Sequence, residues 1–347
     1  MMKKVLSYTT LCSFVLFFLL ACSGCSDSKT STSVPNPSDA TGIAKRDKVV
    51  LLLNWYPEAE HGGFYAANVH GIYKEFNLDV EIRPGGKTTV VPQELTLERI
   101  EFGVANADDV VLAREQSAPL VALMAPLQNG PRCIMVREDS GISSFEQLEN
   151  ITLQIDPSRP YVPFMQSKGL LGKNVKTVPY FGSVAQLIAD PRTAQQAYSF
   201  SEPLMAEQAG VKVKTLMMSE IGYNPYASLL IASEKYIAKN EDVVRRMVSA
   251  SIQGWRKYLD SPEQTNDYIL SQNQQGMTAE ALAYSVLNLK PLCIPDGFPE
   301  SSVGTMDGVR WSTLVEQLTS IKLIEGKTKP EECFTLKFLP KSELPSL

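Results

Sequence analysis

This sequence has few of the residues on which most metal and redox sites depend. It contains two histidines among 347 residues, His61 and His70, so a histidine-rich metal site is not supported. Of its six cysteines, only Cys22 and Cys25 have the C-x-x-C spacing of a zinc or redox site. Both cysteines stand near the amino terminus, where the sequence indicates an export signal and a site of lipidation instead.

Basic runs and the usual catalytic motifs are also missing. The chain has 33 Lys and Arg against 38 Asp and Glu, and its lysines are scattered, which argues against a nucleic acid as partner. It contains no G-x-S-x-G, no H-E-x-x-H and no G-x-G-x-x-G after a strand, so we expect no enzymatic activity. Residues 83–89 resemble a phosphate loop, but Glu81 replaces the first glycine of that motif and a turn is expected.

The amino terminus is typical of an exported protein. Two lysines at positions 3 and 4 precede an apolar run that ends at Leu20, and a small residue follows. Leu19-Leu20-Ala21-Cys22 resembles a bacterial lipobox, in which the cysteine sulfur receives a diacylglyceryl group. We therefore predict a lipoprotein signal peptide at residues 1–21 and lipidation of Cys22. Cys25 is the competing site, and an uncleaved membrane anchor is the alternative, although the apolar run is short for one.

The residues after the signal are almost all polar. A segment rich in Ser, Thr, Asp, Pro and Asn cannot bury enough apolar surface to offset the entropy lost on ordering. We predict a flexible tether at residues 22–47. The remaining chain is long enough, in a sequence that is 44% hydrophobic, to form more than one core.

The globular part is organised around residues 53–67, LNWYPEAEHGGFYAA. They follow the apolar run 49–53, which predicts a strand buried on both faces. Pro57 ends the strand because it cannot donate to a ladder, and a helical pattern follows the two glycines. Asn54 and Trp55 are thus expected at the carboxyl end of the strand, where open α/β sheets bind ligands. The alternative is an aromatic cluster that only closes the sheet edge.

Strands and helices alternate through the rest of the chain, which is the pattern of parallel sheets with helices on both faces. Strands are expected at 78–82, 102–105, 120–124, 133–136, 151–155, 195–203, 210–217 and 228–231. Helices are expected at 90–100, 109–116, 143–148, 262–270, 278–287 and 306–318, with a long one after Asn240. Trp255 and Trp311 lie on apolar helical faces and are expected in the core.

The motif at 53–67 resembles the opening of the SsuA/THI5-like, or NMT1, group of substrate-binding proteins. The resemblance continues through residues 101–114, 118–122, 143–148 and 197–203, and it extends over residues 48–340. It implies an α/β fold of the type-II periplasmic binding protein class, with two lobes joined by two crossings and the ligand cleft between them. Lobe 1 is predicted at 48–131 and 225–347, and lobe 2 at 132–224.

The resemblance also implies ligand-binding residues at the strand ends. Trp55 and Tyr198 are expected to stack on a planar ring, with Tyr65 lining the pocket. Asn54 offers a donor and an acceptor to the rim of the ring, and Glu202 accepts from an amino-heteroaromatic edge.

Four further residues are weaker candidates for the same site: His61, Asn106, Asp108 and Tyr161. Arg159 is a lesser candidate that would favour an anionic ligand such as a sulfonate. The two prolines near Arg159 depart from the small residues of many relatives at this turn, which limits the transfer of lobe 2 contacts.

The predicted function is that of a lipid-anchored, monomeric protein of the periplasm or cell surface. It would pass a pyrimidine-like thiamine precursor to the permease of an ABC importer, with the membrane reached through the lipid anchor and without a cofactor or metal. The alternatives are a binder of an alkanesulfonate or a flavin, and a pyrimidine synthase. Synthases of this family have a cysteine-rich run that is missing here.

Export would permit disulfide formation. A bridge between Cys293 and Cys333 and a pair of buried free thiols both fit the sequence.

Overall fold

The computed structural model describes residues 45–340 and contains two five-stranded sheets. The predicted signal peptide, the lipidation of Cys22 and most of the predicted tether lie outside the described residues. Lys45 and Arg46 are exposed and irregular, and the first strand begins at Asp47.

The first sheet has the strand order β2-β1-β3-β10-β4. Its strands are β1 (Asp47–Leu52), β2 (Leu78–Arg83), β3 (Phe102–Ala105), β4 (Leu120–Met124) and β10 (Leu229–Ser233). β1 is parallel to β2 and β3, whereas β10 is antiparallel to both of its neighbours. Every residue of β4 and β10 is buried, as expected for strands covered on both faces.

The second sheet has the order β7-β6-β8-β5-β9. Its strands are β5 (Arg132–Arg137), β6 (Thr152–Gln154), β7 (Lys176–Val178), β8 (Thr193–Tyr198) and β9 (Val213–Met217). β6 is parallel to β7 and β8, and β5 is antiparallel to β8 and β9. We call each sheet with its helices a lobe, and the two connections between the sheets are the first crossing (125–131) and the return crossing (222–228).

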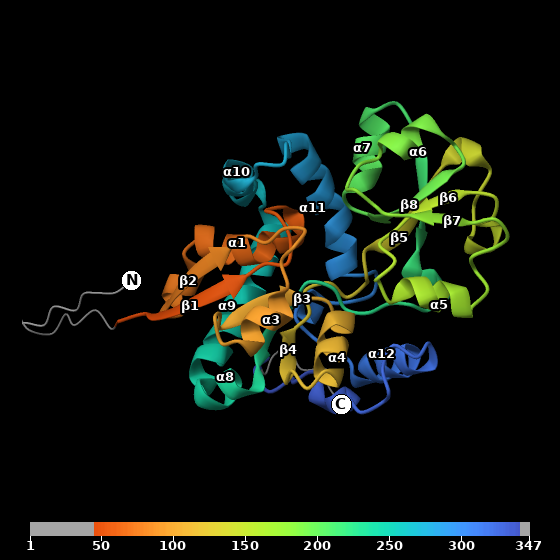
Figure 1. Ribbon diagram of the computed structural model, residues 1–347. Coiled ribbons are helices and arrows are strands. Elements are labelled where there is room, and N and C mark those ends of the chain that lie inside the picture. The colour runs from red at the N-terminus through yellow and green to blue at the C-terminus, as the bar shows by residue number, and fades with distance from the viewer. Residues whose placement is uncertain (1–44, 341–347) are drawn as a thin grey trace, which may run out of the picture. The chain divides into compact units, whose positions relative to one another are not determined.

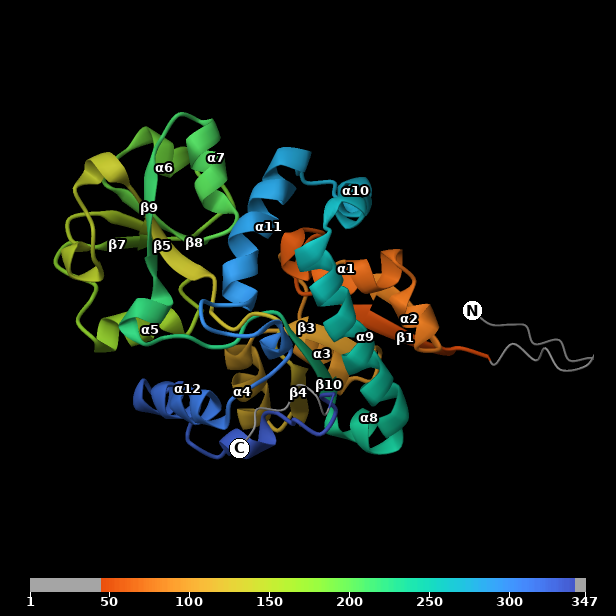
Figure 2. The same ribbon diagram turned by 180° about the vertical axis from the view of Figure 1, so that it is seen from behind.

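Helices separate the strands in both lobes (Figures 1 and 2). They are α1 (Gly62–Val69), α2 (Ile72–Glu75), α3 (Val91–Thr96), α4 (Ala107–Glu115), α5 (Tyr161–Ser167), α6 (Ala185–Ala189), α7 (Glu202–Gln208), α8 (Glu234–Lys239), α9 (Glu241–Asp260), α10 (Glu263–Gln272), α11 (Ala279–Cys293) and α12 (Gly308–Ser320). Short 3-10 turns include η1 (Ala59–His61), η3 (Phe145–Gln147) and η4 (Met218–Ile221).

The buried apolar side chains form three cores. The first joins α1, α9, α10 and α11 to one face of the first sheet. The second joins α3, α4 and α12 to the other face of that sheet and continues into the second lobe, where it includes α5. The third lies between the second sheet and α6 and α7. One core is therefore shared by the two lobes.

Two glycines allow α1 and α9 to pack closely against each other. A Cβ atom built on Gly63 would lie 2.1 Å from the ring of Trp255, and one built on Gly62 would lie 1.9 Å from that of Tyr258. Trp255 is fully buried, and Trp311 is 1% exposed, so the predicted core positions of both tryptophans are confirmed.

Several predicted element limits need correction. The helix expected at 90–100 ends at Thr96, because Glu98 adopts a left-handed conformation with φ 56°. The helix expected at 143–148 is the single 3-10 turn η3, where the Gln147 side chain accepts from the Ser143 amide at 2.7 Å. The strand expected at 195–203 ends at Tyr198.

The Cys293–Cys333 bridge is not formed. Both residues are buried free thiols, and they belong to different cores, Cys293 to the first and Cys333 to the second. The alternative of two buried free thiols describes the structure.

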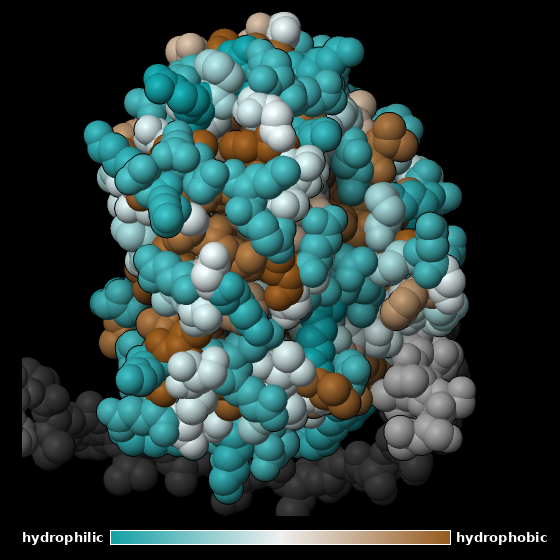
Figure 3. All heavy atoms as spheres, turned by 90° about the vertical axis from the view of Figure 1, so that its right-hand side faces the viewer, coloured by the Kyte–Doolittle hydropathy of each residue, from teal (hydrophilic) through white to brown (hydrophobic). Residues whose placement is uncertain are grey.

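Among residues 45–340, none of the helices is both long enough and apolar enough to cross a membrane. On the face shown in Figure 3, hydrophobic residues stand in separate groups among hydrophilic ones. The described residues of this face thus form no broad apolar patch.

Candidate functional site

The loop after β1 presents an amide and two aromatic rings. Asn54, Trp55 and Tyr56 are each partly exposed, and the rings of Trp55 and Tyr56 meet edge to face with centroids 5.2 Å apart. The loop stays close to the neighbouring strand, since the Gly85 amide donates to the Trp55 carbonyl at 2.9 Å. An indole face and an amide are therefore available at the carboxyl end of β1.

His61 supports Asn54 from inside the fold. It is fully buried, and its Nε2 lies 2.8 Å from Asn54 Oδ1. Burial lowers the pKa of His61 to about 3, so the ring is neutral at pH 7. The structure thus gives His61 a role in orienting Asn54, and it places the side chain away from the surface.

Tyr65 also lies in the interior. It is 1% exposed within the first core, and its ring centroid is 5.7 Å from that of Tyr268. Its hydroxyl has no hydrogen-bond partner among the described residues.

The polar groups of Asn106 form hydrogen bonds at the start of α4. Its amide N–H donates to Asp109 Oδ2 at 3.1 Å, and its Oδ1 accepts from the Ser228 amide at 3.3 Å. Asn106 is the N-cap residue of α4, so its polar groups are used within the first lobe.

Asp108 forms a buried ion pair between the lobes. Its Oδ2 accepts from Arg132 Nη1 at 2.5 Å and from the Tyr223 hydroxyl at 3.1 Å. Burial alone would raise the pKa of Asp108, but the Arg132 charge and the Tyr223 hydroxyl hold that pKa below its usual range. Asp108 belongs to the first lobe and Arg132 to the second, so the pair joins the two lobes beside the crossings.

Aromatic rings of the second lobe surround Arg132. The Arg132 guanidinium carbon lies 5.7 Å from the centre of the Tyr161 ring, and the Tyr161 hydroxyl donates to Gln196 Oε1 at 3.0 Å. Tyr198 is partly buried, with its ring centroid 5.6 Å from that of Phe200. Burial raises the pKa of the Tyr198 hydroxyl, and Arg132 acts against that rise, so the two groups are close.

Glu202 is the first residue of α7, and it reaches back to β8. Its Oε2 accepts from the Tyr198 amide at 2.8 Å, and its Oε1 accepts from the Tyr180 hydroxyl at 2.9 Å. Burial raises the pKa of Glu202, and these two donors oppose the rise. The carboxylate is thus held in a fixed orientation by its own lobe.

Two carboxylates of the first lobe, Glu58 and Glu60, lie near Glu202 and were not predicted. Glu60 is 3% exposed, and its Oε1 accepts from Ser228 Oγ at 2.7 Å. Burial raises the pKa of Glu60 to about 6, with the charge of Glu202 adding to the rise and Arg132 opposing it. Burial and the charges of Glu60 and Glu202 raise the pKa of Glu58. The charge of Glu202 thus raises the pKa of both carboxylates of the first lobe.

The sequence held a weak signal for these two glutamates. Both stand in the motif 53–67, but glutamates just before a helix usually serve as charges at its N-terminus. Arg132 gave no such signal, because a single arginine at the start of a strand is common.

Arg159 lies on the same side as this cluster. Its Nε is 3.3 Å from Asp156 Oδ2, and the charges of Arg132 and Asp109 both act on it. The structure thus brings together Asp108, Tyr161, Tyr198 and Glu202 of the predicted residues, with Arg159, Arg132, Glu58 and Glu60. Asn106, His61 and Tyr65 are engaged within the first lobe.

A small pocket lies where the crossings meet this cluster. Its volume of about 10 Å³ is near the minimum for one water molecule, so it is not the place of an organic ligand. Among residues 45–340 there is no group of histidine, cysteine and acidic residues that could hold a metal ion.

Comparison with known proteins identifies the family. The family model described as NMT1/THI5 like matches residues 58–265. The chain belongs to the NMT1/THI5-like family. This confirms the resemblance seen in residues 53–67.

Full-length relatives of this NMT1/THI5-like protein are binding proteins. The riboflavin-binding protein RibY of Chloroflexus aurantiacus is 23% identical in an alignment 361 positions long, which covers 98% of this chain and 99% of that protein. The formylaminopyrimidine-binding protein of Halalkalibacterium halodurans is 22% identical over 298 residues, which are 83% of this chain and 90% of that protein.

A solved structure confirms the fold. The periplasmic aliphatic sulphonate binding protein SsuA from Escherichia coli matches with a TM-score of 0.62 at 14% identity, covering 82% of this chain and 91% of that one. The predicted periplasmic binding-protein fold is therefore correct. The NMT1/THI5-like chain thus has the fold of the periplasmic binding proteins.

Proposed function

We propose that this protein captures a small, flat heteroaromatic molecule between its lobes and delivers it to the permease of an ABC importer. A pyrimidine-like thiamine precursor is the ligand that we favour. In this proposal lobe 1 comprises residues 48–131 and 225–347, and lobe 2 comprises residues 132–224. The protein would act as a monomer in the periplasm or at the cell surface, anchored through lipid on Cys22.

The observation that carries this proposal is the charge of Glu202, which acts on two carboxylates of the other lobe. Glu58 and Glu60 interact with Glu202, and none of the three forms an ion pair with an arginine or lysine within the distance of a salt bridge among the described residues. A site with this excess of acceptors favours a ligand rich in N–H donors. It disfavours an anionic ligand, because a negative charge close to these groups would be repelled.

The aromatic residues suit the same ligand. Trp55 is partly exposed beside Tyr56, and Tyr198 is partly buried next to Glu202. Aromatic faces bind flat rings by stacking, and the carboxylate then selects among rings by their N–H donors.

The relatives support a binding role and leave three ligand classes to separate. Their names refer to a formylaminopyrimidine, to riboflavin and, for the structural neighbour, to aliphatic sulphonates. Arg159 and Arg132 could attract a sulphonate, but Asp108 already neutralises Arg132. The charge balance of the site therefore favours the aminopyrimidine.

Isothermal titration of two variants tests the proposal. Glu202→Gln keeps the size of the side chain but replaces one acceptor with a donor, so it should weaken binding of an aminopyrimidine by about ten- to a hundredfold. Trp55→Ala should weaken any flat ligand. Glu149→Gln, an exposed carboxylate of the same lobe, is the control and should leave binding unchanged.

The competing classes give different results. An alkanesulfonate should bind Glu202→Gln as well as the wild type or more tightly, because a negative charge is removed. If the wild type binds the sulfonate and ignores aminopyrimidines, the pyrimidine assignment is wrong and the binding role remains. Native mass spectrometry of freshly purified protein would show directly which small molecule accompanies it.

A further inference from the structure

The two crossings between the lobes are hydrogen-bonded to each other through Asn224. The Gly130 amide of the first crossing donates to Asn224 Oδ1 at 2.8 Å. Asn224 Nδ2 in turn donates to Asn129 Oδ1 at 3.3 Å. One side chain of the return crossing thus holds two consecutive residues of the first crossing.

Arg310, at the start of α12, contacts both crossings at once. Its Nε donates to the Asn224 carbonyl at 2.5 Å, its Nη2 donates to Asn224 Oδ1 at 2.9 Å, and its Nη1 donates to the Gln128 carbonyl. The guanidinium carbon lies 3.8 Å from the centre of the Tyr226 ring. A planar fork with five donors can hold several oxygens in one geometry, which a lysine cannot do.

The same residues of the crossings are attached to the first lobe. The amides of Gln128 and Asn129 both donate to the Leu292 carbonyl of α11, at 2.8 and 2.9 Å. The Tyr226 carbonyl accepts from the Ala107 amide of α4 at 2.9 Å. The Tyr226 hydroxyl accepts from the Asp307 amide at 2.8 Å. Residues 128–129 and 224–226 therefore move with the first lobe.

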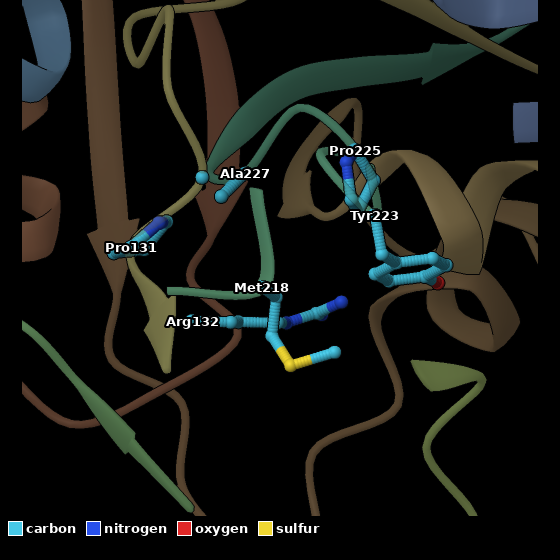
Figure 4. Close-up of a pocket in the computed structure, with 7 residues that line it drawn as sticks. Pro131, Arg132, Met218, Tyr223, Pro225 and Ala227 are labelled. Carbon is cyan, nitrogen blue, oxygen red and sulfur yellow. The ribbon is translucent and has the colours of Figure 1, made fainter. Parts of the chain in front are cut away.

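The pocket described above lies at the border of this attached region. Figure 4 shows Pro131, Tyr223, Pro225 and Ala227 of the two crossings around it, together with Arg132 of β5 and Met218 of η4. The pocket lies beside Gly130 and Pro131 and has about the volume of one water molecule.

We propose that Arg310 is a positioning residue for ligand binding that fixes the pivot of the hinge. It holds residues 128 and 224–226 on the first lobe, and the second lobe turns about Gly130–Pro131 and about the residues before Gly222. In a binding protein that closes on its ligand, the position of this pivot sets how the two halves of the site meet. This role of Arg310 requires that the two lobes of the fold move relative to each other. It does not depend on the class of ligand proposed above.

Hydrogen–deuterium exchange of the ligand-free protein tests it. In Arg310→Met, the amides of residues 128–130 should exchange at least about tenfold faster than in the wild type, because their local opening becomes easier. The amides of both sheets should keep their wild-type rates. Asn224→Ala should also accelerate exchange at residues 128–130. The double variant should exchange little faster there than either single variant, since both residues belong to one hydrogen-bond network.

Arg245→Met is a matched control. Arg245 also donates to a carbonyl, that of Lys337 at 3.1 Å, and lies over a ring, that of Phe338 at 5.5 Å, but it does not contact the crossings. It should leave the exchange of residues 128–130 unchanged. If Arg310→Met does not fold, Arg310→Lys, which keeps the charge and loses the fork, should show a smaller acceleration in the same residues.

Two results would overturn the proposal. One is wild-type exchange at residues 128–130 in folded Arg310→Met or Arg310→Lys. The other is faster exchange spread evenly over α12 and the first sheet, which would mean that Arg310 only stabilises its own helix.

Discussion

Glu60 is a buried carboxylate whose protonation should affect the stability of the protein. Its pKa is raised by burial from 4.5 to about 6, so the folded protein binds this proton more tightly than the unfolded chain does. Stability contributed by the protonated form is present below pH 4.5 and is lost as the pH rises to about 6. The free energy of unfolding of Glu60→Gln, relative to that of the wild type, should therefore be about 2 kcal/mol greater at pH 7.5 than at pH 4.

Urea unfolding of both proteins at the two pH values measures this difference. Glu149→Gln, which changes an exposed carboxylate of the second lobe, is the control. A stability difference between Glu60→Gln and the wild type that stays constant from pH 4 to 7.5 would contradict the raised pKa.

At the scale of single residues, the sequence predicted the ends of strands better than the contacts of side chains. Asn54 and Trp55 stand at the end of β1 as predicted, because an apolar run followed by proline defines a strand end. The ion pair of Asp108 with Arg132 could not be predicted, since it depends on how two segments meet in space. The same is true of the contact between His61 and Asn54.

At the scale of elements, the crossing of α1 and α9 depends on glycine. Gly63→Ala would place a methyl group against the buried indole of Trp255, where 2.1 Å is available. The strain should outweigh the better helix propensity of alanine and destabilise the protein by about 1–3 kcal/mol. Thermal or urea unfolding measures the loss.

Gly308→Ala is the control for this substitution. Gly308 also lies in a helix, but its nearest neighbour to an added Cβ is 3.5 Å away, in Phe334. This variant should be as stable as the wild type or slightly more stable. Equal stability of Gly63→Ala and the wild type would mean that α1 and α9 can move apart at little cost.

Element limits were predictable where composition changes abruptly. β3 and β4 have the predicted limits, because β3 is an apolar run between Glu101 and Asn106, and β4 is an apolar run between Pro119 and the Ala125-Pro126 pair. The strand predicted at 195–203 was too long, since Pro203 stands in the first turn of α7 and does not end a strand. Proline fits both positions, and only the tertiary contacts of Glu202 decide between them.

At the scale of the whole molecule, the lipid anchor that we propose would decide where the protein works. If Cys22 carries the lipid, Cys22→Ser should abolish incorporation of labelled fatty acid and release the protein from the membrane fraction. Cys25→Ser should be processed and retained like the wild type. Equal labelling of Cys22→Ser and the wild type would show that the assignment of the lipidated cysteine is wrong.

The position of β10 has a consequence for how the chain folds. Leu230 of β10 pairs with Val104 of β3 on one side and with Met124 of β4 on the other. β3 and β4 therefore cannot be joined until β10 is synthesised, on the order of a hundred residues later. Until β10 arrives, β3 and β4 each present an unpaired apolar edge, which other chains can join. The order of synthesis therefore keeps the first lobe open while the second emerges. If the chain is exported as we propose, this delay would leave it unfolded for longer before export.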